Sequence, residues 1–293
     1  MEININNQKL QKIELLKESD NFKLFKVLDE KDNKYFSLKE IPIKNLNDIE
    51  INEIENEKNI LFNIKSEYII KYYDFYKDKN NFYILMEYFE GIDLKTFINN
   101  HKDKNELIEE KTIYKIILDI CEGLKEIHAN NLIHRDLKPS NILINKNNKI
   151  KIINFGFSEN FELNGKYDKD FEKGQYYIAP EVIKGEKYNN KIGIWALGCI
   201  IYELLTRKIC FQAKSLSGLE KIILKKSHGK IDLTKYNSKW QDLIDLLLKI
   251  DDKERPDINE VYKYINNEFK ELKIDNDIIC MTSKKNIFHF LFS

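Results

Sequence analysis

The spacing of apolar residues along the 293-residue chain changes character near residue 90. Before that point, the segments 23–30 and 35–41 flank a short polar turn, which predicts a β-hairpin. The segments 69–76 and 81–89 predict two further strands. Between the two pairs, apolar residues at helical spacing predict one helix over residues 47–63. The first part of the chain is therefore expected to be a small β-rich unit with one main helix.

Beyond residue 90 the apolar pattern becomes mostly helical. Ile113 to Ile127 keep helical spacing up to Asn130, and the segment 141–155 predicts a short hairpin. Further helices are expected over residues 194–205, 240–249 and 258–272. The order predicts an α+β, bilobal fold with an N-lobe over 1–90, a C-lobe over 91–272 and a tail over 273–293. The tail is expected to pack on its own domain or to dock on a partner.

Composition narrows the class of protein. The 48 basic and 48 acidic residues leave no net charge, which argues against a nucleic acid or an anionic membrane as partner. The four Cys are widely spaced, match no metal-ligand pattern and indicate reduced thiols. The N-terminus lacks an apolar signal region, and the run Ile194–Tyr202 is shorter than the ~18 residues of a membrane helix. We expect a soluble, intracellular, cytoplasmic protein.

The segment His134–Asn141, HRDLKPSN, carries the strongest chemical signal. It places a carboxylate, an ammonium group and a carboxamide close together between a helix and a hairpin. Asp136 could accept a proton from a hydroxyl group, Lys138 could neutralise a transferring phosphoryl group, and the oxygen of Asn141 could ligate a divalent cation. The alternative is a charged loop before a hairpin, which leaves the match of eight consecutive residues to chance.

This segment resembles the catalytic loop of the eukaryotic protein-kinase family, and the resemblance extends along nearly the whole chain. Ala179-Pro180-Glu181 is similar to the motif that closes the family's activation segment. Arg255 stands where the family keeps the arginine that pairs with that glutamate. Trp195 and Gly198 fall in the helix that supports the catalytic loop. Lys138, two residues after Asp136, is similar to the serine/threonine class.

The resemblance implies a set of site residues. Lys39 would hold the α- and β-phosphates of ATP, with Glu57 as its ion-pair partner and Asp136 and Lys138 as catalytic residues. The residues implied around the adenine and ribose are Leu16, Leu24, Ser37, Met86, Glu87, Phe89, Asp93 and Leu143. The metal positions would be Asn141 and Asn154.

Two departures from the family pattern affect the phosphates and the metal. The magnesium motif begins with Asn154, where the family has aspartate, so the ligand carries no charge. The glycine-rich loop aligns with the segment 17–22 and contains no glycine. Lys17, Ser19 and Phe22 each place a side chain where the family's backbone amides approach the phosphates. Asp20 adds a negative charge to the same turn.

Two more departures affect the C-lobe. Gly193 stands where the family carries an aspartate that accepts hydrogen bonds from the catalytic loop. The activation segment from Glu159 to Ile178 contains no Ser or Thr, and Tyr167 precedes the pair Tyr176-Tyr177 as a candidate for modification.

Two hypotheses follow. The first is a pseudokinase that binds ATP weakly, with magnesium use in doubt, and acts as a scaffold or allosteric partner of another protein. The second is a slow or metal-atypical serine/threonine kinase that transfers phosphate to protein hydroxyls. The four departures favour the first hypothesis, and the intact loop from Asp136 to Asn141 favours the second.

Overall fold

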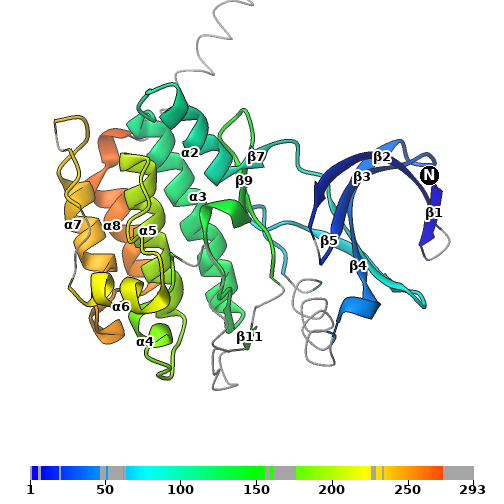
Figure 1. The fold of residues 1–293 in the computed structure, drawn as a ribbon. Coiled ribbons are helices and arrows are strands. Elements are labelled where there is room, and N and C mark those ends of the chain that lie inside the picture. Colours follow the sequence, from blue (N-terminus) through cyan, green and yellow to red (C-terminus); the bar gives the residue numbers. More distant parts are fainter. Residues whose placement is uncertain are drawn as a thin grey trace, which may run out of the picture.

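The computed structural model describes residues 2–5, 8–19, 21–46, 51, 62, 64–155, 159–160, 176–225, 229–232 and 234–272. In Figure 1 the strands of the N-terminal part form one curved sheet, and the helices of the C-terminal part gather on the opposite side. This arrangement confirms the predicted α+β, bilobal fold. The predicted tail over 273–293 and nearly all of the predicted helix over 47–63 lie outside the described residues.

The N-terminal part is a six-stranded antiparallel sheet in the order β1-β2-β3-β4-β6-β5. Its strands are β1 (Glu2–Ile5), β2 (Gln8–Glu18), β3 (Lys23–Asp29), β4 (Lys34–Pro42), β5 (Tyr72–Lys77) and β6 (Asn81–Glu87). The hairpin β3–β4 and the strands β5 and β6 confirm the sequence prediction. A short 3-10 helix, Ile43–Asn45, follows β4.

The first two strands are an addition that the sequence did not reveal. β1 and β2 form a hairpin that pairs with β3. Buried apolar residues from this hairpin and from the rest of the sheet make a separate small core: Ile5, Leu10, Val27, Phe36, Leu38, Tyr83 and Leu85. Asp29 is buried beneath the hairpin, where its carboxylate accepts hydrogen bonds from Gln8 Nε2 at 2.6 Å and from the Lys31 amide at 3.0 Å. The hairpin is therefore fixed to the sheet by apolar packing and by the hydrogen bond from Gln8 to the buried carboxylate of Asp29.

The C-terminal part is a group of helices around one buried helix. The helices are α2 (Leu94–Asp103), α3 (Glu110–Ala129), α4 (Pro180–Ile183), α5 (Lys191–Thr206), α6 (Leu216–Leu224), α7 (Lys239–Leu247) and α8 (Ile258–Glu268), with 3-10 turns at Asp252–Glu254 and Lys270–Leu272. Every residue of α5 from Ile192 to Leu205 is buried, as expected for a helix that is apolar on all sides. The predicted helices correspond to α3, α5, α7 and α8, whereas α2, α4 and α6 were not predicted.

Short strands between α3 and α4 hold the segment His134–Asn141. β8 (Leu132–Ile133) precedes the segment and pairs with β11 (Glu159–Asn160). A 3-10 turn, Pro139–Asn141, ends the segment and leads into the predicted hairpin of β9 (Ile142–Ile144) and β10 (Ile150–Ile152), and β9 also pairs with β7 (Ile92–Asp93). The motif therefore lies in a loop that is fixed at both ends by strand pairing.

Backbone hydrogen bonds join the two parts of the chain close to this loop. The amide of Ile70 donates to the carbonyl of Ile152 at 3.0 Å, and the amide of Ile152 donates to the carbonyl of Tyr68 at 2.8 Å. The large apolar core continues across the same junction, from β4 and β6 to the helices. Residues of the sheet and of the helical part therefore meet at one cleft. No helix among the described residues is long and apolar enough to cross a membrane.

Candidate functional site

The buried side chain of His134 anchors the loop that carries the motif. This side chain is 2% exposed, its ring lies 4.7 Å from that of Phe155, and its Nε2 lies 3.1 Å from the carbonyl oxygen of Ile153. The amide of Asp136 donates to Nδ1 of His134 at 3.3 Å and to its carbonyl oxygen at 2.9 Å. Because Nδ1 accepts a hydrogen bond, the proton of the neutral ring belongs on Nε2, from which it is donated to Ile153.

The carboxylate of Asp136 is held by both of its oxygens. Lys138 Nζ lies 2.8 Å from Oδ1, and Asn141 Nδ2 lies 2.7 Å from Oδ2. Asn141 Nδ2 also donates to the carbonyl oxygen of Asp136 at 2.8 Å. The side chain of Asp136 keeps 21% of its surface exposed, so it can still meet a hydroxyl group from outside. The loop thus brings Asp136, Lys138 and Asn141 together.

Asn141 and Asn154 form an amide pair at the position expected for a metal. A carboxylate can only accept hydrogen bonds, so Asp136 fixes the NH₂ group of Asn141 toward itself and leaves Oδ1 of Asn141 facing away. That oxygen accepts a hydrogen bond from Asn154 Nδ2 at 3.2 Å. Asn154 has φ of 73°, in the left-handed region that Asn and Asp adopt more readily than other side chains.

This arrangement does not fit a magnesium ion. Mg²⁺ is held in proteins through one or two carboxylates, and here the two side chains at the metal positions are neutral and hydrogen-bonded to each other. The nearby carboxylate of Asp136 is already held by Lys138 and Asn141. In the described part of the chain, no group of three or more His, Cys, Asp or Glu side chains could hold a metal ion.

A cleft of about 100 Å³ lies between the sheet and the hairpin β9–β10. Its lining residues are Lys17, Phe22, Leu24, Ser37, Lys39, Ile70, Tyr72, Met86, Glu87, Ser140, Asn141, Leu143, Ile153 and Asn154. Leu24 and Met86 come from the sheet and Leu143 from β9, so apolar side chains face the cleft from both sides. An apolar slot with a few polar groups at its ends suits a flat heterocycle such as adenine.

Most of the residues expected around a nucleotide meet at this cleft. Leu24, Ser37, Lys39, Met86, Glu87, Leu143, Asn141 and Asn154 all line it. Phe89 is partly buried against the large core. Asp93 caps α2, where its carboxylate accepts hydrogen bonds from the amide and the hydroxyl group of Thr96, both at 2.9 Å. Glu57 lies outside the described residues.

Leu16 does not line the cleft; its neighbour Lys17 does. The pairing of β2 with β3 shifts by one residue between Leu15 and Lys17, so that Lys17 pairs with Leu24. Leu16 is the extra residue of this bulge and is 37% exposed. Lys17 was expected beside the phosphates, whereas Ile70, Tyr72, Ser140 and Ile153 were not expected in the lining. The pairing of Tyr72 with Met86 shows how β5 brings Tyr72 there, which a count along one strand cannot reveal.

Glu87 joins the cleft to the C-terminal part of the chain. Its Oε2 lies 2.9 Å from Lys151 Nζ on β10 and accepts a hydrogen bond from the amide of Lys71 at 3.2 Å. The amide of Glu87 in turn donates to the carbonyl oxygen of Lys71 at 2.8 Å. These contacts fix the backbone at the place where the expected hinge begins.

The turn between β2 and β3 brings an aromatic ring into the other end of the cleft. The amide of Ser19 donates to the carbonyl oxygen of Phe22 at 3.0 Å, and the amide of Phe22 donates to Oγ of Ser19 at 3.2 Å. Lys39 Nζ lies 5.2 Å and Lys17 Nζ 5.9 Å from the centroid of the Phe22 ring. Two ammonium groups and one ring thus occupy the end where the family's glycine-rich loop would wrap phosphates.

A second cavity, of about 30 Å³, adjoins the catalytic loop. Asp136, Lys138, Tyr177 and Gly193 are among its lining residues. A Cβ atom on Gly193 would lie 3.6 Å from His128 Nε2 and 3.7 Å from Leu124 Cδ2, so α5 approaches α3 at this point. Burial lowers the pKa of His128 to about 4; Asp257 opposes this shift and Lys191 reinforces it. The imidazole that faces Gly193 is therefore neutral at pH 7.

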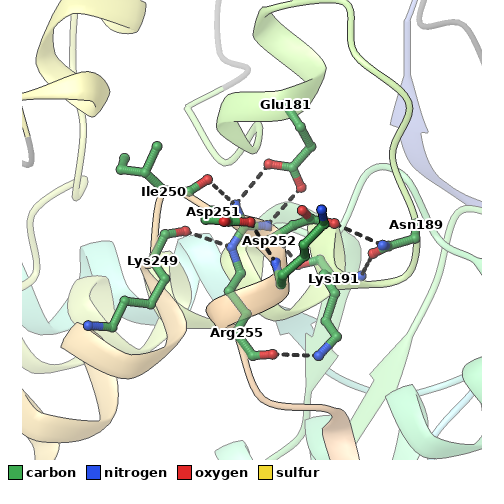
Figure 2. A network of polar contacts seen from close by, with 9 residues as sticks. Glu181, Asn189, Lys191, Lys249, Ile250, Asp251, Asp252 and Arg255 are labelled. Carbon is green, nitrogen blue, oxygen red and sulfur yellow. Dashed lines mark hydrogen bonds and ion pairs between the residues drawn. The ribbon is translucent and has the colours of Figure 1, made fainter.

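The predicted pair of Glu181 and Arg255 is confirmed. Arg255 Nη1 lies 2.7 Å from Oε1 and Nη2 lies 2.8 Å from Oε2 of Glu181, as Figure 2 shows. The remaining donors of the guanidinium reach the carbonyl oxygens of Lys249, Ile250 and Lys191. The guanidinium also lies 5.1 Å from the ring of Trp195. This pair fixes α4 to the turn that precedes α8, and the hydrogen bond to the Lys191 carbonyl adds the start of α5. Residues of α4 and α5 contribute to the second cavity.

Comparison with known proteins decides the family. The sequence matches the protein kinase domain over residues 20–265. The chain belongs to the protein kinase family. This kinase domain is 32% identical over 257 residues to the probable serine/threonine-protein kinase nek2 of Dictyostelium discoideum, an alignment that covers 85% of the chain and 61% of that relative. It is 30% identical over 254 residues to the serine/threonine-protein kinase Nek1 of Mus musculus, covering 87% of the chain and 21% of the relative.

The domain is also 35% identical over 225 residues to the serine/threonine-protein kinase Nek8 of Danio rerio, covering 76% of the chain and 32% of that relative. The chain therefore corresponds to between a fifth and about three fifths of the length of these relatives. The serine/threonine class expected from Lys138 agrees with all three. The β1–β2 hairpin lies entirely before the part of the chain that matches the kinase domain.

Proposed function

We propose that this kinase domain is a pseudokinase that binds an adenine nucleotide weakly and acts through contacts with another protein, as a scaffold or as an allosteric partner. The observation that carries the proposal is the amide pair of Asn141 and Asn154. It replaces a charged metal site by two neutral side chains whose hydrogen bonds satisfy each other. Loss of that charge removes a contribution of several kcal/mol to the transition state of phosphoryl transfer.

The cleft supports nucleotide binding. Its apolar walls suit adenine, and Lys39 lies at the end where phosphates would be expected. Phe22 occupies space at the same end, which is why we expect the binding to be weak. In this proposal Glu87 and Phe89 supply the backbone that pairs with adenine, and Asp93 is placed near the ribose.

A slow serine/threonine kinase is the second candidate, and one observation favours it. Asp136 is partly exposed, its orientation is fixed by Asn141, and Lys138 lies beside it. This is the geometry needed to orient the hydroxyl group of a protein substrate and to neutralise a transferring phosphoryl group.

A phosphoryl-transfer assay on the purified protein, with ATP and a general protein substrate in Mg²⁺ and in Mn²⁺, separates the two candidates. We expect no transfer above that of the Asp136→Asn variant. The Asn154→Asp variant is expected to remain far below the ~1–100 s⁻¹ of ordinary kinases, because Phe22 and Gly193 are unchanged. Turnover in that range by the wild type, or by Asn154→Asp alone, would show that the domain is an active kinase or one substitution away from it.

A further inference from the structure

Two lysines face the phosphate end of the cleft. Lys39 projects from β4 and Lys17 from the end of β2, and both line the cavity. Their ammonium groups are held near the face of one aromatic ring, at 5.2 Å and 5.9 Å from the centroid of Phe22. A cation–π contact with a partly buried phenyl ring is weaker than a charge-assisted hydrogen bond to phosphate. Phosphate oxygens can therefore replace the ring as partners of both lysines.

Two replacements at the site each make its charge more positive than in the family pattern. Lys17 stands at the position of the first glycine and adds a positive charge, and Asn154 stands at the position of an aspartate and removes a negative charge. Together these replacements change the local charge by the same amount as a bound Mg²⁺ ion. The neutral pair of Asn141 and Asn154 also removes the repulsion that a carboxylate would exert on phosphates in the absence of a metal.

Two carboxylates at or beside the cleft, those of Glu87 and of Asp136 next to Asn141, are already engaged. Glu87 is paired with Lys151 at 2.9 Å, and Asp136 with Lys138 at 2.8 Å. Asp20, in the turn between β2 and β3, and Glu57 lie outside the described residues, so binding measurements give the net effect of all these charges.

We propose that Lys17 and Lys39 together bind the phosphates of a nucleoside polyphosphate without a divalent cation, so that Lys17 takes the place of the metal. The inference rests on the proposed function, since it concerns the same cleft. It adds the residue responsible and the ionic form of the ligand, which is metal-free ATP.

The test is calorimetric titration of the full chain with ATP and with adenosine, each in EDTA and in Mg²⁺. In EDTA we expect ATP to bind at least about tenfold more tightly than adenosine, as two charge-assisted contacts imply. Adding Mg²⁺ should not tighten the binding of ATP, because the ion neutralises phosphate charge and meets neutral amides in the cleft.

Matched variants assign the effect to Lys17. Lys17→Gln should weaken the binding of ATP in EDTA about tenfold and leave the binding of adenosine unchanged. The control is Lys23→Gln, which removes a neighbouring lysine that is paired with Glu18 at 2.8 Å and does not line the cleft; it should leave both ligands unaffected.

The inference is overturned if ATP and adenosine bind equally in EDTA, if ATP needs Mg²⁺ to bind, or if Lys17→Gln binds ATP like the wild type. In each of these cases adenosine still binds, and the nucleotide cleft itself stands. If neither ATP nor adenosine binds under any condition, the proposed nucleotide site is refuted, and the inference falls with it.

Discussion

The pair of Glu181 and Arg255 allows a sharp test of how the C-terminal part is held together. The side chain of Arg255 is fully buried and that of Glu181 is 6% exposed. Every N–H group of the guanidinium has an acceptor in the described structure. The substitution Glu181→Gln keeps the shape of the side chain but turns an NH₂ group toward one of these donors, and it leaves a buried charge without its counter-ion.

Removing one partner of a buried ion pair costs about 3–5 kcal/mol, because the remaining charge stays desolvated. For a domain of this size, each kcal/mol lowers the melting temperature by about 2–4 °C, so Glu181→Gln should melt roughly 6–20 °C below the wild type. The double variant Glu181→Leu/Arg255→Met buries no charge and should lose less stability than Glu181→Gln. Scanning calorimetry of the purified variants measures both values.

An exposed pair serves as the control. Lys239 Nζ and Glu268 Oε2 are also 2.8 Å apart, but their side chains are 41% and 40% exposed. Glu268→Gln should change stability by less than about 1 kcal/mol. A loss below about 1 kcal/mol for Glu181→Gln, or a double variant that is less stable than the single one, would show that the guanidinium is not desolvated as described.

Three further predictions follow from the site and its surroundings. Adding Gly193→Asp and glycines at positions 17, 19 and 22 to Asn154→Asp should raise phosphoryl transfer far more than Asn154→Asp does; equal rates would contradict the view that several defects act together. The activation segment should not be switched by phosphorylation of serine or threonine, since neither residue occurs between positions 159 and 178. Intact-protein mass spectrometry after purification from native cells checks this. Phosphorylated Tyr167 together with a changed protease sensitivity would reveal a different switch. Burial raises the pKa of Asp119 to about 6, Glu67 and Glu122 add to the shift and Lys115 and Lys149 oppose it, so the contribution of Asp119 to stability should fall as pH rises from about 4 to 6; in urea titrations the stability of Asp119→Asn relative to the wild type should therefore rise over this range.

The sequence predicted the elements whose patterns are regular. The hairpin β3–β4 follows from two strands around a polar turn, and α3 follows from apolar residues at helical spacing. β2 was not predicted from the sequence because its pairing with β3 is shifted twice, between Lys12 and Glu14 and between Leu15 and Lys17. Each shift moves the following side chains to the other face of the sheet, so the strand shows no simple alternation.

The same irregularity limited what could be predicted of the candidate site. Asp136, Lys138 and Asn141 come together as their spacing suggests, because they lie in a continuous segment fixed at both ends; their catalytic role stays a prediction. The spacing along the chain also suggested Leu16 for the cleft, but a bulge brings its neighbour Lys17 there instead. Hydrogen bonds between amides, such as that of Asn141 with Asn154, depend on side-chain orientation and cannot be read from residue order.

His128 supplies the last prediction, which links the loss of an aspartate at position 193 to the acid stability of the domain. The pKa of His128 is lowered to about 4, mainly by burial, whereas an unfolded chain has the ordinary value of 6.5. Between these values the unfolded state binds a proton that the folded state does not. The contribution of His128 is therefore fully present above pH 6.5 and is lost as pH falls toward 4, on the order of 3 kcal/mol in total.

Gly193→Asp should remove the contribution of His128 to the dependence of stability on pH. The new carboxylate would extend from a Cβ only 3.6 Å from His128 Nε2, and a negative charge at that distance favours the imidazolium. We expect the pKa of His128, followed by NMR of its ring proton, to rise from about 4 to its ordinary value or above. Gly193→Ala is the matched control, since it places the same Cβ in ordinary contact with the ring and adds no charge. If the two variants show the same titration of His128, a carboxylate at position 193 does not interact with the imidazole, and the family's aspartate at this position would not be a partner of His128.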